Sequence, residues 1–125
     1  MNVPDNLYYT KEHEWTSVDG DIATIGITDY AQGELGDIVF VEMPEVGDGT
    51  KQFGSCASIE AVKAVSDLYA SVSGEVTEVN GELEADPQII NKDPYGKGWI
   101  LKIKISEQGE LDNLLSSDDY KELIG

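Results

Sequence analysis

The sequence has very little of the side chains that most catalytic and metal sites need. Among its 125 residues there is one histidine, His13, and one cysteine, Cys56. These two residues cannot supply a tetrahedral zinc site of the usual ligands, so no metal site is expected. A single cysteine also cannot close an internal disulfide, and a reducing compartment is the simplest expectation.

Basic residues are scarce as well. The chain has 8 lysine or arginine residues against 25 aspartate or glutamate residues, which gives a net charge of −17. Nucleic acid is therefore not expected as a partner, because its binding needs clustered basic side chains. Anionic membranes are disfavoured for the same reason. A strongly acidic surface instead suits docking to basic patches on other proteins.

Long hydrophobic runs and leader sequences are missing too. No segment approaches the roughly 18 consecutive apolar residues of a membrane span. Residues 1–5 show neither a charged-then-apolar leader nor an arginine-rich presequence. We expect a cytoplasmic protein of bacterial type, or a mitochondrial matrix protein if a transit peptide has been removed. The length and the 40% hydrophobic content predict one domain over residues 1–125.

Motifs for nucleophilic catalysis and phosphate binding are incomplete. Gly49 and Gly54 have the P-loop spacing, but Ser55 stands where that motif needs lysine. No Gly-x-Ser-x-Gly sequence is present to mark a nucleophile. We therefore expect a protein that is not an enzyme. His13 is expected to hold the amino-terminal strands against a later hairpin rather than to catalyse.

What the sequence does have is scattered glycine and short β-favouring runs. The 13 glycines and four prolines are spread along the chain, which favours many turns and a mostly β fold. The expected strands cover residues 7–10 (continuing toward 18), 22–27, 38–43, 74–79 and 99–105. The apolar run 22–27 predicts burial on both faces. In the last strand, alternation predicts that Trp99, Leu101, Ile103 and Ile105 face inward and that Lys102 and Lys104 face outward.

Short helices are predicted between and after these strands. Thr28 is expected to cap a helix over residues 29–32, and Asp86-Pro87 to begin one or two turns that end at Ile90. Asn80-Gly81 predicts a turn. In the tail, helical spacing relates Leu111, Leu114 and Leu115, and Ser116-Ser117 is expected to cap a last helix that carries Tyr120, Leu123 and Ile124. These apolar faces are expected to pack on the barrel, with a partner-binding helix as the alternative.

A lysine-centred hairpin is predicted over residues 56–70. An unpaired ammonium is costly to bury, so Lys63 at its crest should project into solvent. Its neighbours Val62 and Ala64 are small and leave the amine unshielded. Glu60 and Asp67 lie close by in sequence. Taken alone, these charges are typical of a solvated cluster on an exposed turn.

The whole string around this lysine is more specific than its charges. Ile-Glu-Ala-Val-Lys-Ala-Val-Ser-Asp at residues 59–67, followed by Val-Ser-Gly-Glu-Val at 72–76, resembles the lipoylation hairpin of the glycine cleavage H-protein family. The resemblance continues through residues 13–15, 24–32, 35–42 and 90–99. Ala61 replaces a usual serine and Ser71 a frequent proline. These departures concern the shape of the hairpin and its recognition by a ligase, and they leave Lys63 unchanged.

The resemblance implies a fold, a cofactor and partners. The implied fold is mostly β, a barrel-sandwich hybrid like the flattened barrel of lipoyl and biotinyl carriers, with short helices and a C-terminal helix. Lipoic acid is implied as an amide on Lys63, within a motif formed by Glu60, Val62, Ala64 and Asp67. The implied partners are a pyridoxal-phosphate glycine decarboxylase (P protein), a tetrahydrofolate-dependent aminomethyltransferase (T protein), dihydrolipoyl dehydrogenase (L protein), and a lipoate ligase or lipoyl transferase.

The implied shuttle of an aminomethyl group between these enzymes suggests a cleft. A loaded arm that is unstable in water should be sheltered, and its cationic amine calls for carboxylates. We hypothesise that Glu12, Glu14 and Asp67 line such a cleft and that Ile27 and Tyr30 offer apolar contact. The alternative is that these acids are simply solvated.

Other carriers and other functions remain as alternatives. Biotinyl lysines usually lie between two methionines, whereas Val62 and Ala64 flank Lys63. Lipoyl domains of 2-oxoacid dehydrogenases commonly show Asp-Lys-Ala and are tethered by linkers, which this chain does not contain. An H-like protein that relays lipoate to other carriers is one alternative function. An unmodified β-rich interaction module is another.

Overall fold

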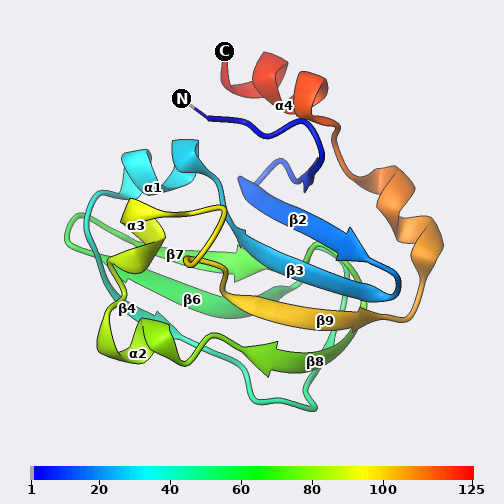
Figure 1. Ribbon diagram of the computed structural model, residues 1–125, viewed down its shortest axis with the longest axis horizontal. Coiled ribbons are helices and arrows are strands. Elements are labelled where there is room, and N and C mark those ends of the chain that lie inside the picture. Colours follow the sequence, from blue (N-terminus) through cyan, green and yellow to red (C-terminus); the bar gives the residue numbers. More distant parts are fainter. Residues whose placement is uncertain (1) are drawn as a thin grey trace.

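The computed structural model describes residues 2–125 (Figure 1). In chain order the elements are β1 (Tyr8–Tyr9), β2 (Glu14–Asp19), β3 (Ile22–Ile27), α1 (Asp29–Leu35), β4 (Ile38–Glu42), β5 (Gly49–Thr50), β6 (Ser55–Ala61), β7 (Val65–Tyr69), β8 (Gly74–Val79), α2 (Glu82–Ala85), α3 (Ile89–Lys92), β9 (Leu101–Ile105), the 3-10 helix η1 (Gln108–Asn113) and α4 (Ser117–Ile124). None of the helices in this range is both long enough and apolar enough to cross a bilayer.

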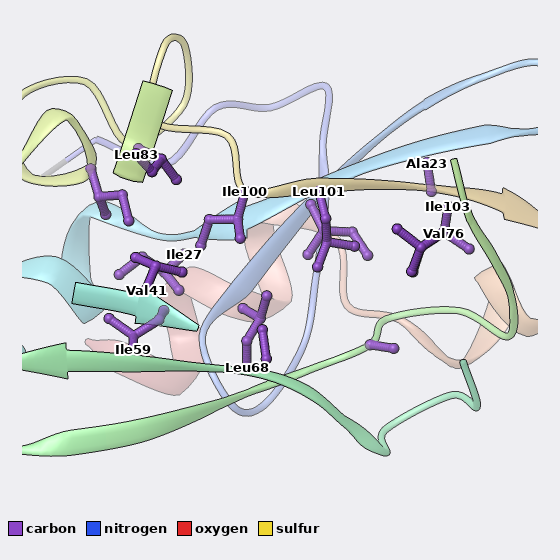
Figure 2. Packing of buried hydrophobic residues seen from close by; sticks show 14 of the residues in the cluster. Ala23, Ile27, Val41, Ile59, Leu68, Val76, Leu83, Ile100, Leu101 and Ile103 are labelled. Carbon is purple, nitrogen blue, oxygen red and sulfur yellow. The ribbon is translucent and has the colours of Figure 1, made fainter. Parts of the chain in front are cut away.

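The strands form two antiparallel sheets that face one another. The larger sheet has the order β1-β2-β3-β9-β8-β5, and the smaller has the order β4-β6-β7. Side chains from both fill the space between them: Val41, Ile59 and Leu68 of the small sheet face Ile100, Leu101 and Ile103 (Figure 2). Because the two sheets stay open at their edges, the fold is a flattened barrel-sandwich, which confirms the predicted fold class.

Strand β9 shows how a long-range contact shifts a local pattern. Leu101, Ile103 and Ile105 are buried, and Lys102 and Lys104 point outward, as predicted. The inward prediction for Trp99 is wrong. Ile100 donates its backbone N–H to the Ile25 carbonyl at 2.8 Å and is itself fully buried, so the alternation begins after it.

Trp99 instead belongs to a second, aromatic cluster. It packs beside Tyr9, Trp15 and Tyr120, and the Lys102 ammonium lies 5.1 Å from its ring centroid. A cation over an aromatic face is attracted by the ring quadrupole, so this lysine covers the outer side of the indole.

Strand β3 is buried on both faces only toward its end. Ala23, Ile25 and Ile27 lie in the core, while Ile22 and Thr24 are half-buried. Gly26 lies directly under the Trp15 indole, where an added Cβ would come within 2.7 Å of Nε1. The prediction of two-sided burial is therefore wrong for the first half of the strand, because the indole covers only the second half.

The amino-terminal strand is interrupted. The sequence predicted extension from residue 7 toward 18, but β1 ends at Tyr9 and β2 begins at Glu14. Between them His13 has a φ of 71°, in the left-handed region, and its N–H donates to the Thr10 carbonyl. This tight turn brings residues 12–14 beside α1.

Helix α1 begins as predicted and ends later. The Thr28 hydroxyl accepts a hydrogen bond from the Ala31 N–H at 3.2 Å, which confirms the cap. The helix continues through Gly33 to Leu35 and ends where Gly36 adopts a φ of 80°. A positive φ is inexpensive only for glycine, so Gly36 and not Gly33 terminates the helix.

The turn predicted at Asn80-Gly81 is confirmed, and two short helices follow it. Gly81 leads into α2, which was not predicted, and α3 begins at Ile89 rather than at Asp86-Pro87. The Asn80 amide donates to the carbonyls of Lys97 and Trp99 at 2.9 and 2.7 Å. The chain turns here because Asn80 binds a distant segment.

The tail is tied to the amino-terminal strand. Tyr9 and Leu115 exchange two backbone hydrogen bonds of 2.9 and 2.7 Å. The helical spacing predicted for Leu111, Leu114 and Leu115 is therefore wrong, because η1 ends at Asn113 and an extended segment follows. Ser116 caps α4 as predicted, and Tyr120 is fully buried against Tyr9, with ring centroids 4.7 Å apart.

Candidate functional site

Lys63 lies in the turn between β6 and β7, exposed to solvent. The Ala61 N–H donates to the Ala64 carbonyl at 2.8 Å and closes the turn. Val62 is 73% exposed, and Lys63 takes part in none of the ion pairs found among residues 2–125. The predicted hairpin and the predicted position of the amine at its crest agree with this geometry.

The turn is anchored to the connection between α1 and β4. The Val62 N–H donates to the Asp37 carbonyl at 3.0 Å, and the stem of Lys63 lies along Gly36. A Cβ at residue 36 would come within 3.0 Å of the lysine Cε. Gly36 therefore both ends α1 and leaves room for the lysine. The sequence alone did not indicate a role for this glycine beside the lysine.

Asn91 holds the same connection from the other side. Its side chain accepts from the Ile38 N–H at 2.9 Å and donates to the Gly36 carbonyl at 2.9 Å and the Gln32 Oε1 at 3.0 Å. This set of bonds fixes the loop on which the lysine turn rests. Asn91 lies in a segment that the family resemblance covers, but nothing in its local sequence indicated this role.

Among the residues that the structure describes, the acidic neighbours Glu60 and Asp67 form no ion pair with Lys63. Glu60 pairs with Val65 on the outer face of the small sheet, and Asp67 of β7, the edge strand of that sheet, pairs with Ser58. They add negative charge beside the turn without neutralising the ammonium.

A hollow of about 290 Å³ lies between the hairpin, the amino-terminal strands and α1. All five residues predicted for an arm-docking cleft border it: Glu12, Glu14, Ile27, Tyr30 and Asp67. His13, Glu34 and Ser66 also line it. Ser66 is three residues beyond Lys63, so the hollow opens close to the base of the lysine.

Glu14 differs from the other acids in this hollow. It is 1% exposed, whereas Glu12 and Asp67 are exposed. Its carboxylate oxygens accept from the Thr10 hydroxyl and, at 3.2 Å, from the Tyr69 N–H. Burial without a cation disfavours the charged form and raises the pKa of Glu14 to about 7. The sequence placed this acid in the cleft but gave no sign of its burial.

His13 also lines this hollow, and its ring packs against neighbouring aromatic side chains. Its Nδ1 lies 2.9 Å from the Tyr120 hydroxyl, and its ring centroid lies 4.8 Å from that of Tyr30. Burial lowers its pKa and favours the neutral ring. The prediction that His13 holds the amino-terminal strands against the hairpin is wrong in its partner, because the His13 ring contacts Tyr30 of α1 and Tyr120 of α4.

Metal and thiol chemistry find no support at this site. Between residues 2 and 125, no three His, Cys, Asp or Glu side chains converge as a ligand set. The Cys56 thiol donates weakly to the Leu68 carbonyl, and burial raises its pKa to about 12. Such a thiol is unreactive because the thiolate is the nucleophile.

The burial of Glu14 predicts a specific dependence of stability on pH. Its folded pKa is raised, so its favourable contribution is complete below about pH 4.5 and is lost as pH rises through about 7. Replacing it with glutamine, which does not ionise, should remove that loss. Urea unfolding from pH 4.5 to 8 should show wild type losing about 3 kcal/mol of unfolding free energy relative to Glu14→Gln. The exposed control Glu84→Gln should follow the wild-type dependence of unfolding free energy on pH. If Glu14→Gln also follows it, the prediction is contradicted.

The fold and the site together define a class. A sandwich of two sheets that presents an exposed lysine on a tight hairpin turn, beside an acid-lined hollow, is a barrel-sandwich domain of the kind used by lipoyl and biotinyl carriers.

Comparison with known proteins narrows the class. Residues 7–125 match the family described as Glycine cleavage H-protein. A glycine cleavage system H protein of Staphylococcus carnosus (strain TM300) is 58% identical over 125 residues, all of this chain and 99% of that protein. One of Halothermothrix orenii is 58% identical over 120 residues, 96% of this chain and 94% of that protein. The crystal structure of a glycine cleavage system H protein from Mycobacterium marinum superposes with a TM-score of 0.90 at 40% identity, covering 98% of this chain and 99% of that one. The chain belongs to the glycine cleavage H-protein family.

Proposed function

We propose that Lys63 carries lipoate as an amide and that the chain acts through this arm as the shuttle protein of the glycine cleavage system. The observation that carries the proposal is the exposed, unpaired amine in the β6–β7 turn of a chain in this family. Nothing among the described side chains competes for the ammonium, so it is available for acylation.

The chain's own part in attachment is that of a nucleophile. A ligase that uses ATP activates lipoate as the acyl adenylate. The Lys63 Nζ, after loss of a proton, attacks the acyl carbon; the C–N bond forms and the C–O bond breaks, so AMP leaves with the electron pair. The resulting amide removes the lysine charge. The small neighbours Val62 and Ala64 leave the approach open, and Gly36 gives the lysine stem a firm support.

The function follows from the chemistry of the attached group. Lipoate bound at Lys63 would supply a redox-active dithiolane that can hold an aminomethyl group, and the partners would be the glycine decarboxylase (P protein), the tetrahydrofolate-dependent aminomethyltransferase (T protein) and dihydrolipoyl dehydrogenase (L protein). The chain itself is a carrier and not an enzyme. The relatives named above come from bacteria, and the cytoplasm is the compartment that we propose.

The hollow between the hairpin and α1 is the proposed shelter for the cationic load. Glu12 and Asp67 offer exposed carboxylates, and Ile27 and Tyr30 offer apolar walls. Glu14 is buried, and its carboxylate accepts hydrogen bonds from the Thr10 hydroxyl and the Tyr69 N–H. A nearby cation would favour its ionised form.

Glu14→Gln should therefore shorten the lifetime of the loaded arm. Glutamine keeps the shape of the side chain but removes the charge, so the load should leave the hollow more often and hydrolyse several-fold faster. Formaldehyde release from the isolated, loaded carrier measures this, with Glu84→Gln as an exposed acidic control. An unchanged release rate in Glu14→Gln would remove Glu14 from this role.

The direct test of the function is a mass spectrum. The chain incubated with lipoate, ATP and a lipoate ligase should gain one lipoyl group, located on the peptide that contains residue 63, and should then support glycine decarboxylation with the P protein. No mass gain would favour an unmodified interaction module. Acylation without support of decarboxylation would favour the lipoate-relay alternative.

A further inference from the structure

The outer face of the small sheet is unusually apolar near the lysine turn. Phe40, Glu60 and Val65 are cross-strand partners on β4, β6 and β7, so their side chains project from the same face. Phe40 is 52% exposed and Val65 is 66% exposed. These two side chains therefore present an apolar area to solvent.

A β-bulge enlarges this apolar area. The register of β4 against β6 shifts between Ile38 and Phe40, so Val39 and Phe40 both oppose Glu60. In such a bulge two residues of one strand take the place of one, and the ladder is locally disrupted. Val39 is 48% exposed in consequence, while Ile38 remains fully buried. With Val62 of the turn, these side chains form the apolar turn face: Val39, Phe40, Val62 and Val65.

Carboxylates border the apolar turn face. Glu60 lies within it, and the next outward row consists of Glu42, Ser58 and Asp67. That row leads into a shallow hollow of about 550 Å³, to which Glu45 and Asp48 also contribute. In the described part of the chain neither ion pair involves any of these acids.

We propose that the apolar turn face and its acidic border form the docking surface for the enzyme that acylates Lys63. This inference rests on the proposed function. The partner is an enzyme with an apolar contact patch flanked by lysine or arginine side chains, placed to meet Glu60 and the acid-lined hollow.

The position of this face beside Lys63 favours the acylating enzyme as its partner over the enzymes that act on the lipoylated arm. To form the amide, an enzyme must bring its acyl carbon to the Lys63 Nζ itself, so its surface meets the residues around the turn. Val65 is two residues from Lys63, and Phe40 lies two strands from Val65, within roughly 10 Å across the sheet. The apolar turn face thus lies inside the footprint that acylation requires.

Charge selects a basic partner over a second copy of this chain. The net charge is −17, and two such faces brought together would oppose Glu42, Glu60 and Asp67 with the same carboxylates. Like charges at such an interface repel, whereas a basic border would attract and orient the chain.

The experiment measures enzymatic acylation of three serine-substituted or charge-reversed variants beside wild type. Phe40→Ser tests the apolar face and Glu42→Lys tests the acidic border. Phe53→Ser is the matched control, because Phe53 is 48% exposed and lies outside this face. A lipoate ligase with ATP and lipoate supplies the readout, kcat/KM from intact mass. Acetylation of Lys63 by acetic anhydride reports the intrinsic access of the amine, and thermal unfolding reports the fold.

We expect kcat/KM to fall at least tenfold in Phe40→Ser and in Glu42→Lys, with wild-type values in Phe53→Ser and equal chemical acetylation in all four proteins. Unchanged kcat/KM in folded Phe40→Ser and Glu42→Lys, or an equal fall in Phe53→Ser, would overturn the docking surface while leaving the carrier function intact. A wild-type chain that the ligase does not acylate at residue 63 would instead overturn the proposed function.

Discussion

Replacing Lys63 with arginine is expected to abolish acylation by the ligase and with it all glycine decarboxylation that depends on this carrier. Arginine keeps the positive charge and nearly the length of lysine, so the turn and its bond from Val62 to Asp37 should be unchanged. Its guanidinium stays protonated at any working pH and offers no free amine to an acyl carbon. The loss should therefore be complete rather than partial.

Intact mass after incubation with lipoate, ATP and ligase measures the first effect, and exchange of labelled carbon dioxide into glycine with the P protein measures the second. Lys97→Arg is the matched control, since Lys97 is also exposed but lies far along the chain. A lipoyl mass gain in Lys63→Arg, or loss of the gain in Lys97→Arg, would show that the assignment of residue 63 is mistaken.

Replacing Gly74 with alanine is expected to cause the largest loss of stability of any single methyl group added to this fold. Gly74 begins β8 and pairs with Thr50 on one side and Ile105 on the other. A Cβ at this position would overlap the Lys104 carbonyl oxygen and come within 2.8 Å of the Ile103 Cγ2. Ile103 is fully buried, so neither neighbour can withdraw without moving the sheet.

The expected cost is about 3 kcal/mol or more of unfolding free energy, which corresponds to a fall of roughly 10 °C in Tm. Gly33→Ala is the control, because an added Cβ there meets nothing within 4 Å and lies in the interior of α1. That change should raise stability by about 0.5–1 kcal/mol, since alanine favours helix over the unfolded chain. Thermal and urea unfolding would test both, and equal stabilities of the two variants would contradict the crowding at Gly74.

The parts of the fold that sequence predicts well are those that local pattern controls. The alternation in β9 follows from the two-residue period of a strand, and the caps at Thr28 and Ser116 follow from hydroxyls that satisfy free N–H groups. The lysine turn is predicted because an ammonium between small residues has no inexpensive buried position.

The errors occur where contacts between segments far apart in the sequence determine the local structure. Trp99 was expected inside, but the bond from Ile100 to Ile25 takes the next residue into the core instead. Leu115 was expected in a helix, but pairing with Tyr9 extends it. These bonds join residues 75 and 106 positions apart (100 − 25 and 115 − 9), so no local window contains them.

The sequence predicted which residues border the hollow, but it did not predict that Glu14 is buried. The five residues expected in the cleft do border one hollow, yet the burial of Glu14 depends on Thr10 and Tyr69, which reach it from a turn and from another strand. The departure from the family pattern at Ser71 has a similar explanation. Its hydroxyl is fully buried and accepts a hydrogen bond from the Thr16 hydroxyl at 2.7 Å, an interaction that proline could not make.

The hydroxyl of Tyr120 connects the last helix to the turn before β2 and to the start of α1. It meets the His13 ring at 2.9 Å and the Thr28 hydroxyl at 2.7 Å, one on the turn that lines the hollow and the other at the start of α1. Displacing α4 would deprive both groups of their partner at once. If the hollow beside His13 holds a ligand, we expect that ligand to protect the tail from proteolysis, because His13 and Tyr120 are in direct contact.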